Sequence, residues 1–161
     1  TRAARSLSNL IQSLGYHARP HGGPMAGPVL LIPPAVECGM AELGKHGSLI
    51  NRTYGSSFRL AGVLTDLPLV ADGPDEIAVD EFCTNCRVCT SACPPDAIFQ
   101  EKQSVRGVTK WFVDFDKCIP YFNDTQGCGI CIAVCPWSRP GTAPRLAEKM
   151  IAKRARRAST G

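Results

Sequence analysis

Hydrophobic positions at the start of the chain follow the period of a helix. Gly15 stands where a glycine ends a helix, and residues 16–19 then predict a short strand. Residues 20–28 are rich in glycine and proline and predict a loop. The helical residues within 2–14 are Ala4, Leu7, Leu10, Ile11 and Leu14.

A second helix and a strand-forming stretch complete the first part of the pattern. The apolar run 29–32 precedes Pro33, and proline suits a first helical turn, so we expect a helix over 33–43. Residues 44–47 break that helix, and 57–67 are rich in strand formers. Residues 70–80 are polar and turn-prone. We therefore place a partial α/β region at 1–72.

The C-terminal residues 141–161 begin with a turn and continue as a basic helix. Between Arg145 and Arg157 there are six basic residues and one acidic residue, so this segment accounts for the net charge of +4. One short basic run is typical of a solvated helix, with contact to nucleic acid or lipid as the alternative. We assign the segment no function and expect no nucleic-acid partner.

Composition is that of a globular chain, with 44% hydrophobic and 20% charged residues among 161. No apolar run is long enough to span a bilayer. The chain starts at Thr1, so we expect upstream residues that could carry targeting information. Nine cysteines is an odd number and argues against a fully paired disulfide framework.

Eight of the cysteines form two groups that both end in Cys-Pro. Three thiolates two residues apart can wrap one face of a four-iron cubane, whereas the fourth follows a short helical turn and points elsewhere. We expect these turns at 87–93 and 129–135. The first group is Cys83-x2-Cys86-x2-Cys89-x3-Cys93-Pro94. The second group is Cys118-x9-Cys128-x2-Cys131-x3-Cys135-Pro136.

In bacterial two-cluster ferredoxins, the fourth cysteine of each group binds the other cluster. The sequence therefore predicts a 2[4Fe–4S] module over 73–140. Zinc is the alternative, but triplets followed by Cys-Pro do not match its four-ligand sites. The expected ligands of cluster one are Cys83, Cys86, Cys89 and Cys135. The expected ligands of cluster two are Cys93, Cys118, Cys128 and Cys131.

Two further residues receive structural interpretations. Cys38 is the ninth cysteine, and we expect a buried free thiol on the second helix. Trp137 directly follows Cys135-Pro136, and we expect it to pack near cluster one and limit water there.

Several short motifs together resemble the C-terminal half of reductive dehalogenases, from about Gly15 to Trp137. Epoxyqueuosine reductases are related and share part of this stretch. The dehalogenase motifs are Gly39-Met40-Ala41-Glu42-Leu43-Gly44-Lys45-His46-Gly47, Leu49-Ile50, Tyr54-Gly55, Arg59-Leu60, Thr65-Asp66-Leu67-Pro68-Leu69, Trp111, Asp114 and the second cysteine group through Trp137. The epoxyqueuosine reductase version of the loop is Gly44-Lys45-His46, Leu49-Ile50-Asn51 and Tyr54-Gly55-Ser56.

The resemblance implies an α+β fold: part of a nitroreductase-like α/β region that binds cobalamin, followed by the bacterial-ferredoxin-like module. The module would take electrons from a ferredoxin, a flavodoxin or a reductase domain and pass them to the corrinoid. The corrinoid would then remove halide from an organohalide, and the protein would position and insulate the corrinoid.

The resemblance also places a glycine-flanked loop near the corrinoid. Backbone amides there could approach a phosphate or propionamide, and Lys45 or His46 could add charge. The alternative is a plain turn with a solvated Lys45. His17 and His21 receive no role. The expected corrinoid contacts are Leu43, Gly44, Lys45, His46, Gly47, Leu49, Ile50 and Asn51.

The catalytic acid of these families belongs to an upstream portion, so we leave the catalytic residue open and do not assign Tyr16, Tyr54 or Tyr121. We expect this chain to be a fragment or subunit of an oxidoreductase. Location is left open between the cytoplasm and export by an upstream Tat signal. The alternatives are an epoxyqueuosine-reductase-like tRNA-modifying enzyme and a stand-alone 2[4Fe–4S] electron carrier.

Overall fold

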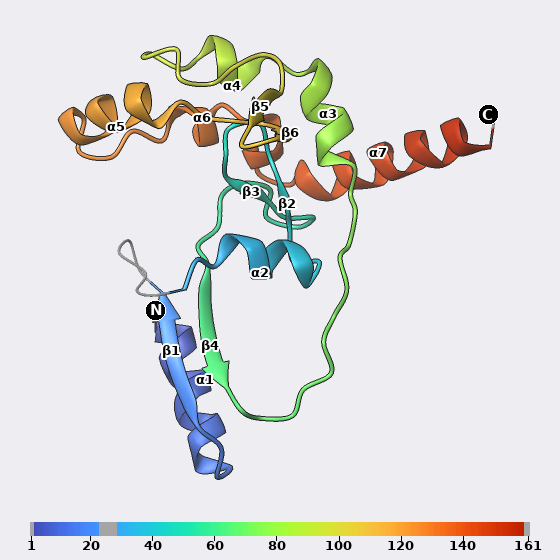
Figure 1. Ribbon diagram of the computed structural model, residues 1–161. Coiled ribbons are helices and arrows are strands. Elements are labelled where there is room, and N and C mark those ends of the chain that lie inside the picture. Colours follow the sequence, from blue (N-terminus) through green and yellow to red (C-terminus); the bar gives the residue numbers. More distant parts are fainter. Residues whose placement is uncertain (1, 23–28, 160–161) are drawn as a thin grey trace. The chain divides into compact units, whose positions relative to one another are not determined.

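The computed structural model describes residues 2–22 and 29–159 (Figure 1). Helices and strands are mixed, as expected for an α+β protein. In this part of the chain, no helix is both long and apolar enough to cross a membrane. The elements are α1 (Arg2–Ser13), β1 (Ala18–Gly22), α2 (Ile32–Glu37), β2 (Glu42–Leu43), β3 (Leu49–Ile50), β4 (Ala61–Thr65), α3 (Val79–Asn85), α4 (Val88–Ser91), β5 (Gln103–Val105), β6 (Val108–Lys110), α5 (Phe115–Asp124), α6 (Ile130–Ala133), the 3₁₀ helix η1 (Pro136–Ser138) and α7 (Ala143–Ala158).

The chain divides into two compact units, and each is built from two separate stretches of sequence. The first unit contains Thr1–Gly39 and Phe58–Pro74, and the second contains Met40–Ser57 and Asp75–Gly161. These limits differ from the expected boundaries after residues 72 and 140. Residues 40–57 and the basic C-terminal helix are parts of the unit that holds the cysteine groups.

The first unit packs α1 against an antiparallel pair of strands. β1 pairs with β4 so that Ala18 lies opposite Thr65, and the Ser8 hydroxyl donates to the Ala18 carbonyl at 3.1 Å. The helix predicted over 2–14 is confirmed, and Gly15 follows it with φ +91°. β1 extends beyond the strand expected at 16–19 and includes part of the predicted 20–28 loop. Residues 23–28 of that loop lie outside the described ranges. The pairing of β1 with β4 explains the extension.

The helix expected over 33–43 is too long. α2 ends at Glu37, and Gly39 follows with φ +68°, a left-handed conformation that favours glycine and ends a helix. Residues 42–43 instead form β2, which pairs with β3 in a hairpin closed by the turn at 44–48. The expected helix break at 44–47 is therefore the tip of a hairpin.

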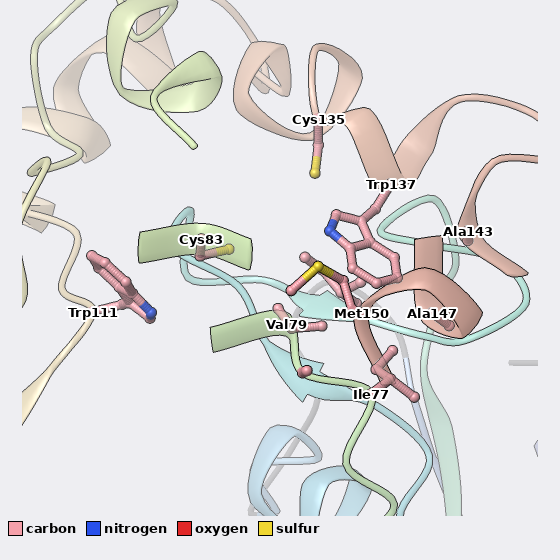
Figure 2. Close-up of a cluster of buried hydrophobic side chains, with 11 residues drawn as sticks. Ile77, Val79, Cys83, Trp111, Cys135, Trp137, Ala143, Ala147 and Met150 are labelled. Atoms are coloured by element: carbon pink, nitrogen blue, oxygen red, sulfur yellow. The ribbon is translucent and has the colours of Figure 1, made fainter. Parts of the chain in front are cut away.

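The second unit has a buried core around its tryptophans (Figure 2). Ala147 and Met150 of α7 contribute to this core, and Arg154 on the same helix makes ion pairs with Glu76 and Glu81. The expected C-terminal helix is confirmed, and its inner face packs into the unit. The core residues are Ile50, Ile77, Ala78, Val79, Cys83, Trp111, Cys135, Trp137, Ala143, Ala147 and Met150.

Candidate iron-sulfur site

The two cysteine groups are carried by corresponding elements of the second unit. Cys89 lies on α4 and Cys131 on α6, the short helices expected within 87–93 and 129–135, and these helices pack against each other. Cys83 lies on α3, whereas Cys118 lies on α5. The long spacing between Cys118 and Cys128 thus contains a helix that the sequence pattern did not predict.

The first sulfur set brings together cysteines from both motifs. Burial raises the pKa of the Cys83 thiol to about 12, with a backbone hydrogen bond from Lys45 acting against it and the charges of Cys89, Cys135 and Cys86 adding to it. Burial likewise raises the pKa of Cys89 to about 11, with further increases from Cys86 and Cys135. Cys135 comes from the second motif, so this set has the composition expected for cluster one.

The second sulfur set has the complementary composition. Burial raises the pKa of Cys131, and the charges of Cys128, Cys93 and Cys118 raise it further. The pKa of Cys118 is raised by burial and then by Cys93 and Cys128. Cys93, from the first motif, is therefore near three cysteines of the second motif, as the crossed pattern requires.

A cavity of about 260 Å³ lies among the second sulfur set. Cys93, Cys118, Cys128 and Cys131 line it, and most of the remaining lining is apolar. Thiolates are the preferred ligands of iron–sulfur clusters, and a shielded apolar shell controls the access of water to such a site. The donor set and its surroundings therefore fit a cluster.

Backbone amides point at several of these sulfurs. The Ala97 N–H donates to Cys93 Sγ at 3.4 Å, and the N–H of Trp137 donates to Cys135. Within the described residues, no group of three or more His, Cys, Asp or Glu side chains is arranged to hold a single metal ion. This agrees with a cluster, because the four cysteine sulfurs around a cubane lie further apart than the ligands of one ion. The N–H···S bonds described above are a recognised means of tuning the reduction potential of such a cluster.

Lys45 is the main functional side chain whose place the sequence did not reveal. It is 2% exposed, and its Nζ donates to the carbonyls of Cys86 at 2.8 Å and Gln100 at 2.9 Å. Nζ also lies 4.5 Å from the ring centre of Trp111. Its positive charge lowers the pKa of Cys89. The ammonium group thus binds backbone carbonyls and an aromatic ring inside the second unit, and the alternative of a solvated Lys45 is wrong.

His46 is also buried, in a neutral form. Its Nδ1 accepts a hydrogen bond from the Ser48 N–H at 3.1 Å, so the proton belongs on Nε2, which lies 3.3 Å from Ser56 Oγ. Ser56 in turn donates to the Leu49 carbonyl at 2.9 Å. Burial lowers the pKa of His46 to about 4. The side chain therefore carries no charge at neutral pH.

The other residues of this loop have mainly structural contacts. The Gly44 N–H bonds to Ser48 O, and the Gly47 N–H bonds to Gly44 O, so both amides are engaged in the turn. Asn51 accepts bonds from the amides of the next turn, and Leu49 and Ile50 are buried. Leu43 is half-buried in β2. Contact with a corrinoid stays a prediction for the eight loop residues.

Both Cys38 and Trp137 were expected to be buried, and only Trp137 is. Cys38 is exposed at the C-terminal end of α2, so the expectation of a buried thiol is wrong. The short helix leaves the side chain uncovered. Trp137 is 1% exposed and packs edge-on against Phe82, with ring centres 5.5 Å apart. Its expected packing role is confirmed.

Residues 82–138 match the family model described as a 4Fe-4S dicluster domain. This match covers both cysteine groups and η1. The chain therefore contains a domain of the iron–sulfur electron-transfer class.

Comparison with individual proteins extends this class assignment. The chain is 35% identical over 152 residues to a tetrachloroethene reductive dehalogenase of Desulfitobacterium hafniense, covering 86% of this chain and 27% of that protein. It is 35% identical over 129 residues to the epoxyqueuosine reductase of Cyclobacterium marinum, covering 70% of this chain and 38% of that protein. A solved reductive dehalogenase is 31% identical with a TM-score of 0.76, over 88% of this chain and 21% of the other.

The chain is thus homologous to reductive dehalogenases and to epoxyqueuosine reductases, which confirms the resemblance in the sequence motifs. It spans about a quarter of the length of the reductive dehalogenases it matches.

Proposed function

We propose that this chain is the electron-transfer portion of a cobalamin-dependent reductive dehalogenase and holds two [4Fe–4S] clusters. The observation that carries the proposal is the crossed grouping of the cysteines: Cys135 shares a buried core with Cys83 of the first motif, and Cys93 lines one cavity with the three other cysteines of the second set. Bound clusters would supply one-electron transfer. The protein holds the thiolates, donates amide hydrogen bonds to their sulfurs and excludes water.

The corrinoid part of the proposal is supported by the homologues. The structurally similar reductive dehalogenase is one whose structure suggests a mechanism for B12-dependent dehalogenation. By that likeness, the first unit would be part of a nitroreductase-like corrinoid-binding region. The loop from Leu43 to Asn51 would contact the corrinoid through its exposed edge at Gly47, while Lys45 and His46 support the loop from inside.

The partners follow from the same chemistry. An external one-electron donor of the ferredoxin, flavodoxin or reductase-domain class would reduce one cluster, and the rest of the enzyme would supply the catalytic acid and the organohalide pocket. The epoxyqueuosine reductase homologue keeps a second candidate open, namely a tRNA-modifying reductase with the same electron-transfer portion.

Anaerobic reconstitution with iron and sulfide tests the cluster assignment. We expect about eight irons per chain. Cys135→Ala should impair cluster one and Cys93→Ala cluster two, each seen as loss of a different EPR signal of the reduced protein. Cys38→Ser is the matched control, because Cys38 is exposed and belongs to neither set. If Cys93→Ala and Cys86→Ala removed the same signal, the crossed assignment would be wrong.

Corrinoid binding requires its own measurement. Cobalamin added to the reconstituted chain, together with the upstream part of the enzyme, should change its absorption spectrum to that of a protein-bound corrinoid. An unchanged spectrum with both clusters present would favour a stand-alone electron carrier. Salt-sensitive binding of a tRNA stem-loop would instead favour the tRNA-modifying candidate.

A further inference from the structure

The indole nitrogen of Trp137 is buried without a hydrogen-bond partner. Trp137 is 1% exposed, and its Nε1 has no acceptor among the described residues. Leaving a buried N–H unpaired costs about 1–3 kcal/mol, so such a group calls for an acceptor. The other tryptophan provides a contrast, because Trp111 Nε1 donates to Asp80 at 2.8 Å.

The ring is packed in the buried core and contacts Phe82. Phe82 packs edge-on against it at an interplanar angle of 77°. The backbone of Trp137 lies directly against Gly55, so closely that an added Cβ at Gly55 would lie 1.8 Å from the Trp137 carbonyl oxygen. Because the ring has so little freedom, the direction of its N–H is a property of the fold.

That direction is toward the first sulfur set. Figure 2 shows the indole nitrogen on the edge of the ring that faces the sulfurs of Cys83 and Cys135, while the six-membered ring lies toward α7. All three residues belong to the same buried core. The backbone N–H of Trp137 already bonds to Cys135, so the indole would add a second donor from one residue.

We propose that Trp137 Nε1 donates a hydrogen bond to a sulfur of cluster one and thereby raises its reduction potential. This inference rests on the proposed function, since the acceptor is a sulfur of the cluster or of its thiolate ligands. Reduction adds negative charge to the cluster, so a donor at sulfur stabilises the reduced form more than the oxidised form. Trp137 is in this sense a positioning and tuning residue.

The experiment compares Trp137→Phe with wild type by anaerobic redox titration followed by EPR. We expect the equilibrium constant for reduction of one cluster to fall about tenfold, which is about 59 mV for a one-electron couple. The second cluster should be unchanged. Trp111→Phe is the control, because it loses an indole whose N–H is bonded to Asp80, and both cluster potentials should stay near those of wild type.

A second substitution separates the hydrogen bond from ring packing. Replacing Trp137 by 3-benzothienylalanine keeps the bicyclic shape and exchanges the N–H for sulfur, so it should reproduce the shift seen with Trp137→Phe. Equal potentials in this protein and wild type, with iron content intact, would overturn the inference and leave the proposed function standing. Absence of iron from the wild-type chain would overturn the proposed function itself.

Discussion

Replacing Lys45 with methionine should strongly destabilise the second unit. Lys45 is 2% exposed, yet its ammonium group reaches two backbone carbonyls, on Cys86 and Gln100. These carbonyls lie 14 residues apart in sequence, on either side of the second half of the first cysteine motif. Methionine keeps most of the length and apolar character of the side chain and removes the three donors, so the substitution isolates the ammonium group.

The size of the effect follows from what is left unpaired. The carbonyls of Cys86 and Gln100 are only partly buried, so each one that loses its donor costs about 1–2 kcal/mol, and the contact with Trp111 adds about 1–2 kcal/mol in a desolvated setting. Relief from burying the ammonium charge offsets several kcal/mol of this sum. We therefore expect a net loss of about 3 kcal/mol, or roughly a hundredfold in the folding equilibrium.

The assay is anaerobic unfolding of the reconstituted protein in guanidinium chloride. Far-UV circular dichroism reports the fold, and visible absorption of the clusters reports cofactor loss. Because cluster loss is irreversible, rates of unfolding are compared rather than midpoints. Lys45→Met should unfold up to about a hundredfold faster than wild type.

Lys110→Met is the matched control, because Lys110 is exposed on β6. Its effect should lie within about 0.5 kcal/mol, as is usual for surface substitutions. If Lys45→Met unfolded at the same rate as Lys110→Met, the two carbonyls would have to be satisfied without the ammonium group. The account of Lys45 as a buried anchor of the motif would then be refuted.

Three other substitutions test separate features of the second unit. Burial lowers the pKa of His46 to about 4 in the folded protein, below its unfolded value of 6.5. The contribution of neutral His46 to the free energy of unfolding is therefore largest above pH 6.5 and falls by about 2 kcal/mol between pH 7 and pH 5. His46→Gln should flatten this dependence, measured by unfolding at both values. Gly55→Ala should prevent stable folding because its Cβ would collide with the Trp137 carbonyl, whereas Gly107→Ala, with open space around it, should cost about 1–2 kcal/mol in thermal unfolding. Glu42→Ala should cost about 1–2 kcal/mol in the same assay, because Glu42 accepts from the Val79 and Ile77 amides at the start of α3.

Sequence reasoning succeeded where the determining interactions are local. The spacing of the cysteines and the Cys-Pro endings predicted α4 and α6, and helical periodicity with a terminal glycine predicted α1. The same reasoning overextended α2, because the apolar residues after Cys38 suit a helix or a strand equally well. The left-handed Gly39 and the pairing of β2 with β3 decide the outcome.

The roles of Lys45, His46 and Glu42 could not be read from the sequence. Lys45 and Glu42 are defined by partners far along the chain, namely Gln100 for Lys45 and Val79 for Glu42. His46 is defined by its burial and by its contact with Ser56, which depend on how the unit packs. A lysine between two glycines resembles a solvated turn unless those partners are known. The orphaned nitrogen of Trp137 is likewise visible only once the core around it is assembled.

Because the second unit consists of two separate stretches of sequence, it cannot fold until the later stretch has been synthesised. Residues 40–57 leave the ribosome well before Trp137 and Met150, which share a core with Ile50. At ordinary rates of translation this early segment waits several seconds for its partners, with the first unit completed in the interval. A shortened gene that began at residue 75 would encode all eight cluster cysteines and still lack Ile50, Lys45 and Gly55. Moving the second unit into another protein would therefore require residues 40–57 as well as the segment from residue 75 onward.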